Sequence, residues 1–536
     1  MSKQATPNLL DRVVDYFAPE VAARRMKART FMAALDGVSW GYESVNGTGP
    51  SRNYKPVTRD ADGDILSQLG TLRGQSRDLA RNHPIAAGAI NTNVDRIVGT
   101  GLALQPEPDR HVLGWSDERM AEWKAHAQRE FSLWSDSLEC DLTLAGNFYD
   151  RQGLVLRTAL ESGDSFTILP DGEASARQPY RLRLQIIEAD RVGNPGGGRD
   201  TAQVAGGIRR NAVGAPEAYH VYDHHPGTVK GLFARRYAGT FIDRVGESGR
   251  LRILHHCRFV RPEQSRGVPY LAPIIDLLKQ LGRYTQAEVQ AAVISAFFTV
   301  FVTTESGQTA PVFGAGQVND PSLSQDLELG PAAIVGLAKG EKIEIADPSR
   351  PNTAFDAFVA ALIKQIGVAL SLPSELLMKQ FNASYSASKA ALLDAWVYFR
   401  SMRVWLARSF CQPVYETWMA EAVALGRIAA PGFFRDPLMR WAYTRANWFG
   451  DSMGSINPKD EVAAYLAAVD GRLMTRERAE WELFGTGWDS TLEQKTREQQ
   501  QLAKRDLLPV AKPGAPAPQD QPAKPADPAK PDPQGS

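Results

Sequence analysis

The sequence has little cysteine, no net charge and no long hydrophobic run. Its 536 residues include only 3 cysteines, Cys140, Cys257 and Cys411, whose odd number and wide spacing exclude a disulfide scaffold and favour a reducing compartment. Since 61 basic residues balance 61 acidic ones, the chain lacks the basic surface of a protein that holds nucleic acid tightly. The most apolar segment, residues 291–302, is shorter than the roughly 18 to 20 residues that cross a bilayer, so we expect no membrane span.

Sequence motifs for nucleotide hydrolysis and for zinc proteases are also missing. The chain contains no G-x-x-x-x-G-K-[ST] loop and no H-E-x-x-H helix. Residues 37–41 match the G-x-S-x-G pattern around Ser39, but the flanking residues predict helix and then loop, whereas a serine nucleophile of this type needs a strand before it and a helix after it. We therefore expect no enzyme activity and no cofactor. A serine hydrolase or processing protease that uses Ser39 is the first alternative.

Histidines are concentrated in one part of the chain. Five of the eight lie between His220 and His256, including the adjacent pairs His224-His225 and His255-His256. Adjacent residues on a strand point to opposite faces of a sheet, so neither pair can chelate one ion by itself. Tetrahedral zinc would need ligands from both segments, and we expect no metal site.

The spacing of apolar residues predicts a mixed α+β chain. Helical spacing covers residues 75–97 with a break at Pro84, and residues 161–259 alternate in polarity as an antiparallel sheet does. A long helix is predicted over residues 386–425, with a kink at Pro413 because proline removes a backbone donor and clashes with the preceding turn. The remaining expectations are helices over 269–298, 353–370, 458–469 and 475–484, a strand over 439–448, and a disordered tail in the last 25 residues, which contain eight prolines.

Short motifs along most of the chain resemble, in the same order, those of the lambda-type tailed-phage portal proteins, the portals of the head-tail connector. They are Ser76-Arg77-Asp78-Leu79, Asn82-His83-Pro84, Gly99-Thr100-Gly101, Glu188-Ala189-Asp190-Arg191, residues 266–273 (RGVPYLAP), residues 346–348 with 350–352, residues 355–358 (FDAF), residues 372–377 (LPSELL), residues 385–388 (YSAS) and residues 457–460 (NPKD). No single motif is specific to these portal proteins. The shared order of all the motifs, from about residue 8 to residue 500, is specific to them.

The resemblance implies an α+β portal fold that assembles as a ring of twelve copies. Its parts would be an N-terminal helical arm and loop at 1–62, an α+β wing at 63–268, a first stem helix at 269–299, a clip at 300–350, a second stem helix at 351–372, a tunnel loop at 373–386, a long kinked helix at 387–425, a wing return at 426–455, a crown at 456–505 and a disordered proline-rich tail at 506–536.

The same resemblance implies a channel at one capsid vertex of the virion, assembled in the host cytoplasm, through which double-stranded DNA is packaged and ejected. The implied partners are the terminase large subunit, the head-tail connector or adaptor, and the major capsid and scaffold proteins. The residues expected nearest the DNA are Lys379, Gln380, Phe381, Asn382, Tyr385 and Lys389. A neutral chain suits DNA that has to slide, because every phosphate contact slows translocation. A monomeric DNA-binding module is the second alternative.

Overall fold

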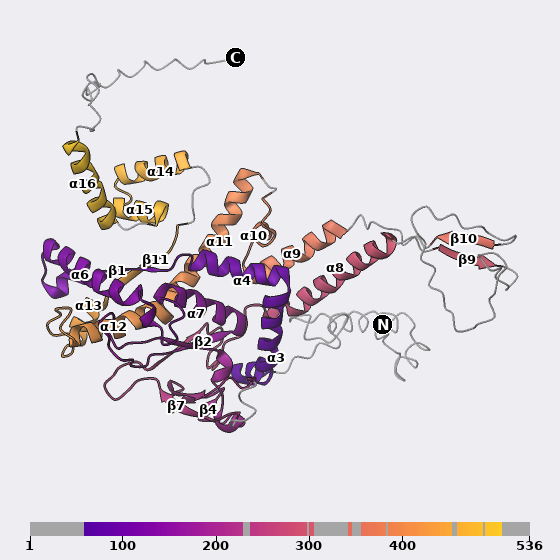
Figure 1. Cartoon of the computed structure of the whole chain (residues 1–536), viewed down its shortest axis with the longest axis horizontal. Helices are drawn as coiled ribbons and strands as arrows, with labels where there is room; N and C mark the ends of the chain where they lie inside the picture. The colour runs from indigo at the N-terminus through magenta and orange to yellow at the C-terminus, as the bar shows by residue number, and fades with distance from the viewer. Residues whose placement is uncertain are drawn as a thin grey trace, which may run out of the picture. The chain divides into compact units, whose positions relative to one another are not determined.

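The computed structural model describes residues 58–228, 236–296, 300–304, 341–345, 355–381, 384–452, 458–485 and 488–505 (Figure 1). The N-terminal arm with Ser39, most of the expected clip and the proline-rich tail lie outside these ranges. The chain divides into two units, Met1–Ser67 with Arg261–Glu263 and Gln68–Val260 with Gln264–Ser536. In the described part of the first unit, Arg261 donates to Asp64 at 2.6 Å and to the carbonyl of Arg59 at 2.9 Å.

Two helices that meet at a proline open the described chain. α3 (Ala61–Asn82) ends just before His83, and α4 (Pro84–Ile97) starts with Pro84 at its first position, where no helical hydrogen bond needs its missing donor. His83 is extended, as sterics require of a residue before proline. The predicted break at Pro84 is therefore confirmed.

Strand β1 (Ala103–Pro106) follows α4 through a turn that contains Gly101. A Cβ on Gly101 would lie 2.6 Å from Tyr149, and its φ is +117°, so glycine is required at this close approach. β1 pairs antiparallel with β11 (Ala446–Phe449), more than 300 residues later in the chain.

Three helices come next, and the two longer ones bury residues in the main core. They are α5 (Arg110–Leu113), α6 (Asp117–Ser135) and α7 (Phe148–Ser162). Ser116 caps α6 by accepting from the backbone of Arg119, and Asn147 caps α7 in a reciprocal box with Asp150. These local signals explain where the two longer helices begin.

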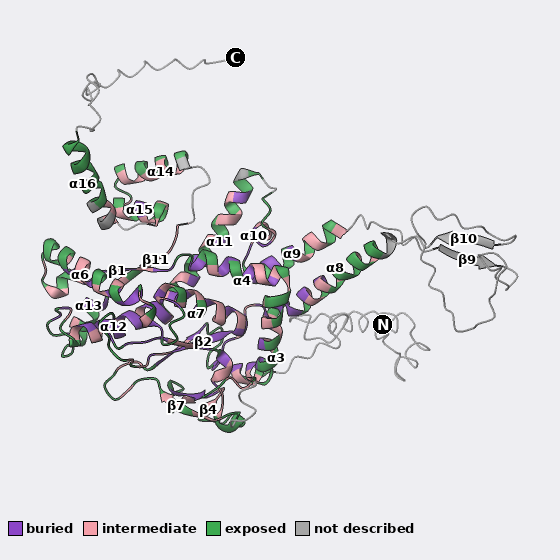
Figure 2. Cartoon of the chain, viewed as in Figure 1, coloured by how far each residue is buried: buried purple, intermediate pink, exposed green. Residues whose placement is uncertain are grey.

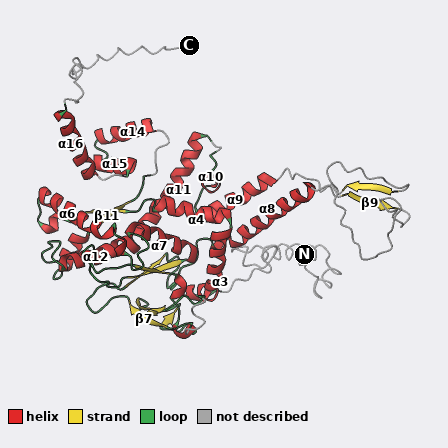
Figure 3. Ribbon diagram, in the orientation of Figure 1, coloured by secondary structure: helices red, strands yellow, loops and turns green. Residues whose placement is uncertain are grey.

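Two antiparallel sheets occupy the region that the alternating sequence predicts (Figure 3). The first has the order β3-β2-β8, from Gln185–Ile187, Asp164–Ile168 and Ile253–Cys257. The second has the order β4-β5-β6-β7, from Val204–Ala205, Ile208–Arg210, Pro216–Tyr222 and Gly239–Asp243. Side chains of both sheets share a small core, which includes Phe166, Ile187, Ile208, Tyr219 and Ile253. The antiparallel prediction is confirmed.

A helical pair with a hairpin between its members follows in the chain. α8 (Ile275–Ala296) and α9 (Phe355–Leu370) are separated in sequence by strands β9 (Val300–Thr304) and β10 (Glu341–Ile345), which pair antiparallel. Tyr284 of α8 stacks on Phe355 of α9, with 5.5 Å between ring centroids. After the short helix α10 (Ser374–Met378) comes the long helical run α11 (Tyr385–Leu406), a π-helical turn at Ala407–Cys411, and α12 (Gln412–Ala424).

The strand predicted over residues 439–448 is largely wrong. Residues Pro437–Thr444 form helix α13, and only β11 is a strand. The aromatic residues in this stretch favour a strand, but Asp436 caps the helix by accepting from the backbone of Leu438, and Pro437 takes its first position. The chain continues with α14 (Pro458–Asp470), α15 (Arg476–Phe484) and α16 (Trp488–Lys504), the last of which was not expected as a separate helix.

Buried residues lie on the helices and strands around α4, α7, α12 and β2 (Figure 2). A group of aromatic side chains is part of this main core. Trp134, Trp418, Phe131, Phe148 and Tyr415 are fully buried, and the ring of Phe131 contacts the other four with centroid distances of 5.0–5.6 Å. Trp134 and Trp418, which lie on α6 and α12, thus pack in the core. None of the helices in the described ranges is long and apolar enough to span a membrane.

Candidate channel segment

The segment between α9 and α11 is an anchored turn. After α9 the backbone of Leu372 donates to the carbonyl of Gly367 at 2.9 Å, and a Cβ on Gly367 would lie 2.4 Å from the Leu372 carbonyl oxygen, so this approach requires glycine. Helix α10 then buries Leu376 and Leu377 in the main core. Backbone contacts of Leu372 and apolar packing of α10 therefore hold this turn in place.

Three of the predicted channel residues project from this anchored turn. Lys379 ends α10 in the left-handed conformation, with φ +53°, and its backbone donates to the carbonyl of Glu375. Lys379, Gln380 and Phe381 are exposed, and half of the surface of Phe381 is open to solvent. No carboxylate of the described residues lies within ion-pair distance of Lys379. The left-handed conformation is that of a common helix C-cap, and it leaves the Lys379 side chain in solvent.

The other predicted channel residues differ from these three. The Nζ of Lys389, on α11, lies 3.0 Å from the carboxylate of Glu461 on α14, so a partner within the chain offsets its charge. Asn382 lies outside the described residues, as does the side chain of Tyr385. The structure thus brings Lys379, Gln380 and Phe381 together and places Lys389 in a contact between helices.

Pro413 lies where the long helix changes its hydrogen-bonding pattern. It is near the start of α12, directly after the π-helical turn Ala407–Cys411. A wider turn accommodates a residue that has no backbone donor and whose ring crowds the carbonyl four residues earlier. The π-helical turn lies directly before Pro413, where the sequence predicts a kink; the kink itself stays a prediction.

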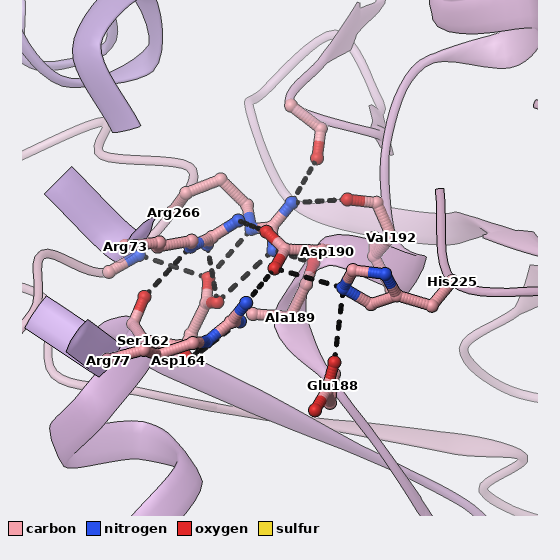
Figure 4. A network of polar contacts seen from close by, with 12 residues as sticks. Arg73, Arg77, Ser162, Asp164, Glu188, Ala189, Asp190, Val192, His225 and Arg266 are labelled. Atoms are coloured by element: carbon pink, nitrogen blue, oxygen red, sulfur yellow. Dashed lines mark hydrogen bonds and ion pairs between the residues drawn. The ribbon is translucent and has the colours of Figure 1, made fainter. Parts of the chain in front are cut away.

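A buried ion cluster, which sequence reasoning missed, holds the sheet region together (Figure 4). Asp164 is completely buried and accepts from Arg266 at 2.7 Å and from Arg73 at 2.8 Å. Burial opposes ionisation of Asp164, but the charges of Arg266 and Arg73 outweigh it and hold the pKa of its carboxyl well below the usual range. Arg266 also donates to the carbonyls of Ala189 and Val192, at 2.7 Å each.

Three of the motifs that carry the portal resemblance meet in this cluster. Arg77 pairs with Asp190, and Asp190 lies 3.4 Å from Arg73. Arg77, Asp190 and Arg266 come from motifs that are far apart in the sequence. The motifs were the only sequence signal for these residues, and the structure gives them a physical reason: their side chains join α3, β2 and the segments around residues 190 and 266.

The paired histidines lie on opposite faces of β8, as predicted. His255 stacks on Phe166 and lies 3.2 Å from Asp164, whereas His256 lies 2.8 Å from the hydroxyl of Thr167. Burial lowers the pKa of His256 to about 3, and the neighbouring His255 adds to this effect.

Two groups of side chains have the ligand types of a metal site. Asp164, His255 and Cys257 form one, and Glu188, Asp190 and His225 form the other. Arginines already neutralise Asp164 and Asp190, and burial raises the pKa of the Cys257 thiol, so neither set of donors fits a cation. Among the described residues, neither group combines histidines of the two segments.

A cavity of about 790 Å³ lies between α11, β11 and α15. Arg400 and Arg403 of α11 line one wall, and Glu477 and Trp481 of α15 line another. Gln105 donates to Glu477 at 2.7 Å, and Arg478 pairs with Glu482 at 2.9 Å.

The sequence of this chain is similar to those of known phage portal proteins. Residues 48–403 match the model of the phage portal protein, lambda family. The portal protein of Escherichia phage N15 is 23% identical over 502 residues, which cover 88% of this chain and 92% of that protein. Portal protein B of Escherichia phage lambda is 23% identical over 490 residues, 86% of this chain and 90% of that protein.

Solved structures of gene transfer agent particles are also similar. A chain from the virion of the native particle is 14% identical with a TM-score of 0.39, and covers 73% of this chain and 96% of its own length. A chain from the neck of the empty particle is 14% identical with a TM-score of 0.41, and covers 77% and 92%. Since the family model matches well over half of the sequence, the chain belongs to the lambda family of phage portal proteins.

Proposed function

We propose that copies of this portal protein assemble into a ring of twelve at one vertex of a tailed-phage head, and that double-stranded DNA passes through the ring during packaging and ejection. The family match over residues 48–403 is the observation that carries the proposal. The exposed residues Lys379, Gln380 and Phe381 on their anchored turn support a DNA-facing role for the tunnel loop at 373–386. The zero net charge fits DNA that slides.

The parts of the portal fold follow from this assignment. We assign α8 and α9 to the stem, the hairpin β9–β10 to the clip, α11 with α12 to the long helix, and α14 to α16 to the crown. The stacking of Tyr284 on Phe355 supports the pairing of the two stem helices. The clip would dock the terminase large subunit and later the head-tail connector, and the wing would meet the major capsid and scaffold proteins, after assembly in the host cytoplasm.

Within the tunnel loop the proposed roles differ. Lys379 would make weak, sequence-independent phosphate contacts, because no carboxylate of the described residues offsets its charge. Phe381 would act as a steric element against the DNA surface. Lys389, paired with Glu461, would contribute less to DNA contact and more to the attachment of α14 to α11.

Negative-stain images of the purified full chain test the proposal. Rings with a central hole support it, and a protein that stays monomeric at high concentration overturns it in favour of a monomeric DNA-binding module. A packaging assay with purified terminase and proheads provides the functional readout. Ser39→Ala is the matched test of the hydrolase alternative, and unchanged packaging together with no turnover of ester substrates eliminates that alternative.

A further inference from the structure

An exposed apolar surface lies on and just before α13. Phe434, Leu438 and Trp441 are 63%, 54% and 50% exposed. Leu438 and Trp441 are three residues apart on the helix and therefore neighbours on its surface, and Phe434 lies in the turn before it. Large exposed apolar side chains in one short segment mark an interaction site more often than chance exposure does.

The same segment carries positive charge. Arg435 and Arg440 are exposed, and no carboxylate of the described residues lies within ion-pair distance of either guanidinium. Arg445, which lies over the ring of Trp441, is already paired with Asp109 at 2.7 Å. We call Phe434, Arg435, Leu438, Arg440 and Trp441 the α13 surface. Its apolar side chains lie beside two arginines and the exposed carboxylate of Asp436, which caps α13, so the segment 434–441 has a net charge of +1.

A second exposed apolar segment follows α6, and we call its residues 136–144 the leucine loop. Leu138, Leu142 and Leu144 in it are exposed, Leu144 to 59%. Leu144 adopts the left-handed conformation, with φ +55°, which is strained for a residue with a branched side chain. The carboxylate of buried Asp141 holds this turn by accepting from Thr143 at 2.6 Å and from the backbone of Ala145 at 3.0 Å. The fold thus maintains strain in a segment that exposes its leucines.

The leucine loop carries the opposite charge. Asp136 is exposed at the end of α6, and its carboxylate accepts from the hydroxyl of Ser135 at 3.3 Å. The described residues place no cation within ion-pair distance of it.

These two surfaces lie at opposite ends of α6. Near the start of that helix, Trp115 and Trp123 contact Tyr443 of α13, with ring centroids 5.6 and 5.7 Å apart. The leucine loop begins directly after Ser135, the last residue of α6. Twelve residues of helix separate Trp123 from Ser135, which is about 18 Å and beyond the reach of an ion pair. The two surfaces are therefore too far apart to satisfy each other within one chain.

We propose that the α13 surface of one copy packs against the leucine loop of the next copy, with Arg440 facing Asp136 of the neighbouring copy. The inference rests on the proposed ring. A head-to-tail contact needs two different surfaces on each subunit, and repetition of that contact gives a ring when the rotation between successive copies closes. Both surfaces have an apolar centre, and their charges are opposite. Binding between the two surfaces is therefore favoured over binding of either one to a surface of like charge.

Charge reversal tests the contact. Arg440→Glu places a glutamate against Asp136 of the neighbouring copy, and Asp136→Arg places an arginine against Arg440. Like charges at an interface repel each other, so each variant alone should lower the affinity between copies at least tenfold. Mixing the two variants in equal amounts restores opposite charges at every contact when they alternate around the ring, which an even number of copies permits. Sedimentation velocity and negative-stain images measure the ring fraction.

Two further variants separate the contact from folding. Leu144→Gly relieves the left-handed strain and should not lower the melting temperature, but it removes an apolar side chain from the contact and should lower the ring fraction. Arg199→Glu with Arg476→Glu is the matched control, because both side chains are exposed and lie outside the two surfaces; it should leave rings intact.

The outcomes are distinct. Rings from the mixture but not from either reversal alone support the contact, and so does loss of rings in Leu144→Gly with an unchanged melting temperature. Rings of wild-type abundance from Arg440→Glu alone, or no rings from the mixture, overturn it. A wild-type protein that forms no rings contradicts the proposed function itself, which separates that failure from failure of this contact.

Discussion

Arg266 and Asp164 form an ion pair that is sealed from solvent: Arg266 donates through Nε at 2.7 Å and through Nη2 at 3.1 Å, and neither side chain is more than 2% exposed. Such a pair does not by itself add much to stability, because desolvation of both charges offsets their attraction. Loss of one partner is strongly destabilising, because it leaves the other charge buried without compensation.

The first prediction concerns this pair. Arg266→Met should lower the free energy of unfolding by about 3 kcal/mol, near the lower end of the usual range because Arg73 still neutralises Asp164. Urea denaturation measures the change. Arg209→Met is the control, because Arg209 pairs with Asp243 at an exposed site, where the loss should be about 0.5 kcal/mol or less. Equal losses in the two variants would contradict a central role for the buried cluster.

The second prediction concerns acid. The pKa of His256 is lowered to about 3 in the folded chain, whereas an unfolded histidine titrates near 6.5. The unfolded state therefore binds one more proton than the folded state between these values, and stability falls as the pH is lowered through this window. Asp164, whose pKa is depressed, contributes stability that is lost only below the ordinary carboxyl value of about 3.9.

His256→Gln should consequently flatten the pH dependence of the unfolding free energy, by about 1.4 kcal/mol per pH unit between about pH 6 and pH 4.5. Glutamine retains a polar group within reach of Thr167, so the comparison isolates the proton. Denaturant unfolding at several pH values gives the slope directly. Parallel slopes for the wild type and the variant would show that His256 takes up no extra proton on unfolding.

The third prediction concerns two glycines in contact. A Cβ on Gly267 would lie 2.0 Å from the carbonyl oxygen of Gly163, a distance that backbone atoms cannot relieve cheaply. Gly267→Ala should therefore destabilise the chain by about 2–3 kcal/mol. Gly70→Ala on α3 is the matched control: no atom lies within 4 Å of its Cβ position, and alanine should stabilise the helix by about 0.5–1 kcal/mol. Thermal melts of both variants should shift in opposite directions.

Local signals allowed part of this fold to be predicted. Pro84 acts on the backbone within one helical turn, so the helix break there follows from its chemistry. The kink predicted at Pro413 stays a prediction, although a π-helical turn directly precedes that residue. The opposite orientations of His255 and His256 follow from the period of a strand. The residues around Trp441 misled the prediction because their preference for strands lost to the cap at Asp436.

The buried cluster could not be predicted in the same way. Arg73 and Arg266 are 91 and 102 residues from Asp164 in the sequence, and no local rule pairs side chains over such separations. Arginine is almost never fully buried, so composition argues against placing Arg266 in the core. The resemblance of the motifs indicated that Arg77, Asp190 and Arg266 matter, but only the fold reveals that they meet.

The last prediction concerns the anchored turn between α9 and α11. Lys379→Ala combined with Phe381→Ala should change DNA packaging or retention by roughly tenfold or less, since a sliding contact involves few phosphates. Rings should still form, because both side chains are exposed and neither contributes to the core. Alanine has the same Cβ as lysine, so the left-handed backbone at position 379 is no more strained in the variant.

Lys504→Ala is the control for the lost charge, because this exposed lysine ends α16 and is far in sequence from the turn. DNA retained per particle after centrifugation, compared across a series of salt concentrations, measures the effect; the salt dependence of retention should weaken in the Lys379 variant and not in the control. If the double variant loses its rings while retaining its melting temperature, the turn is an assembly contact and not a DNA contact, and the channel assignment of residues 373–386 fails.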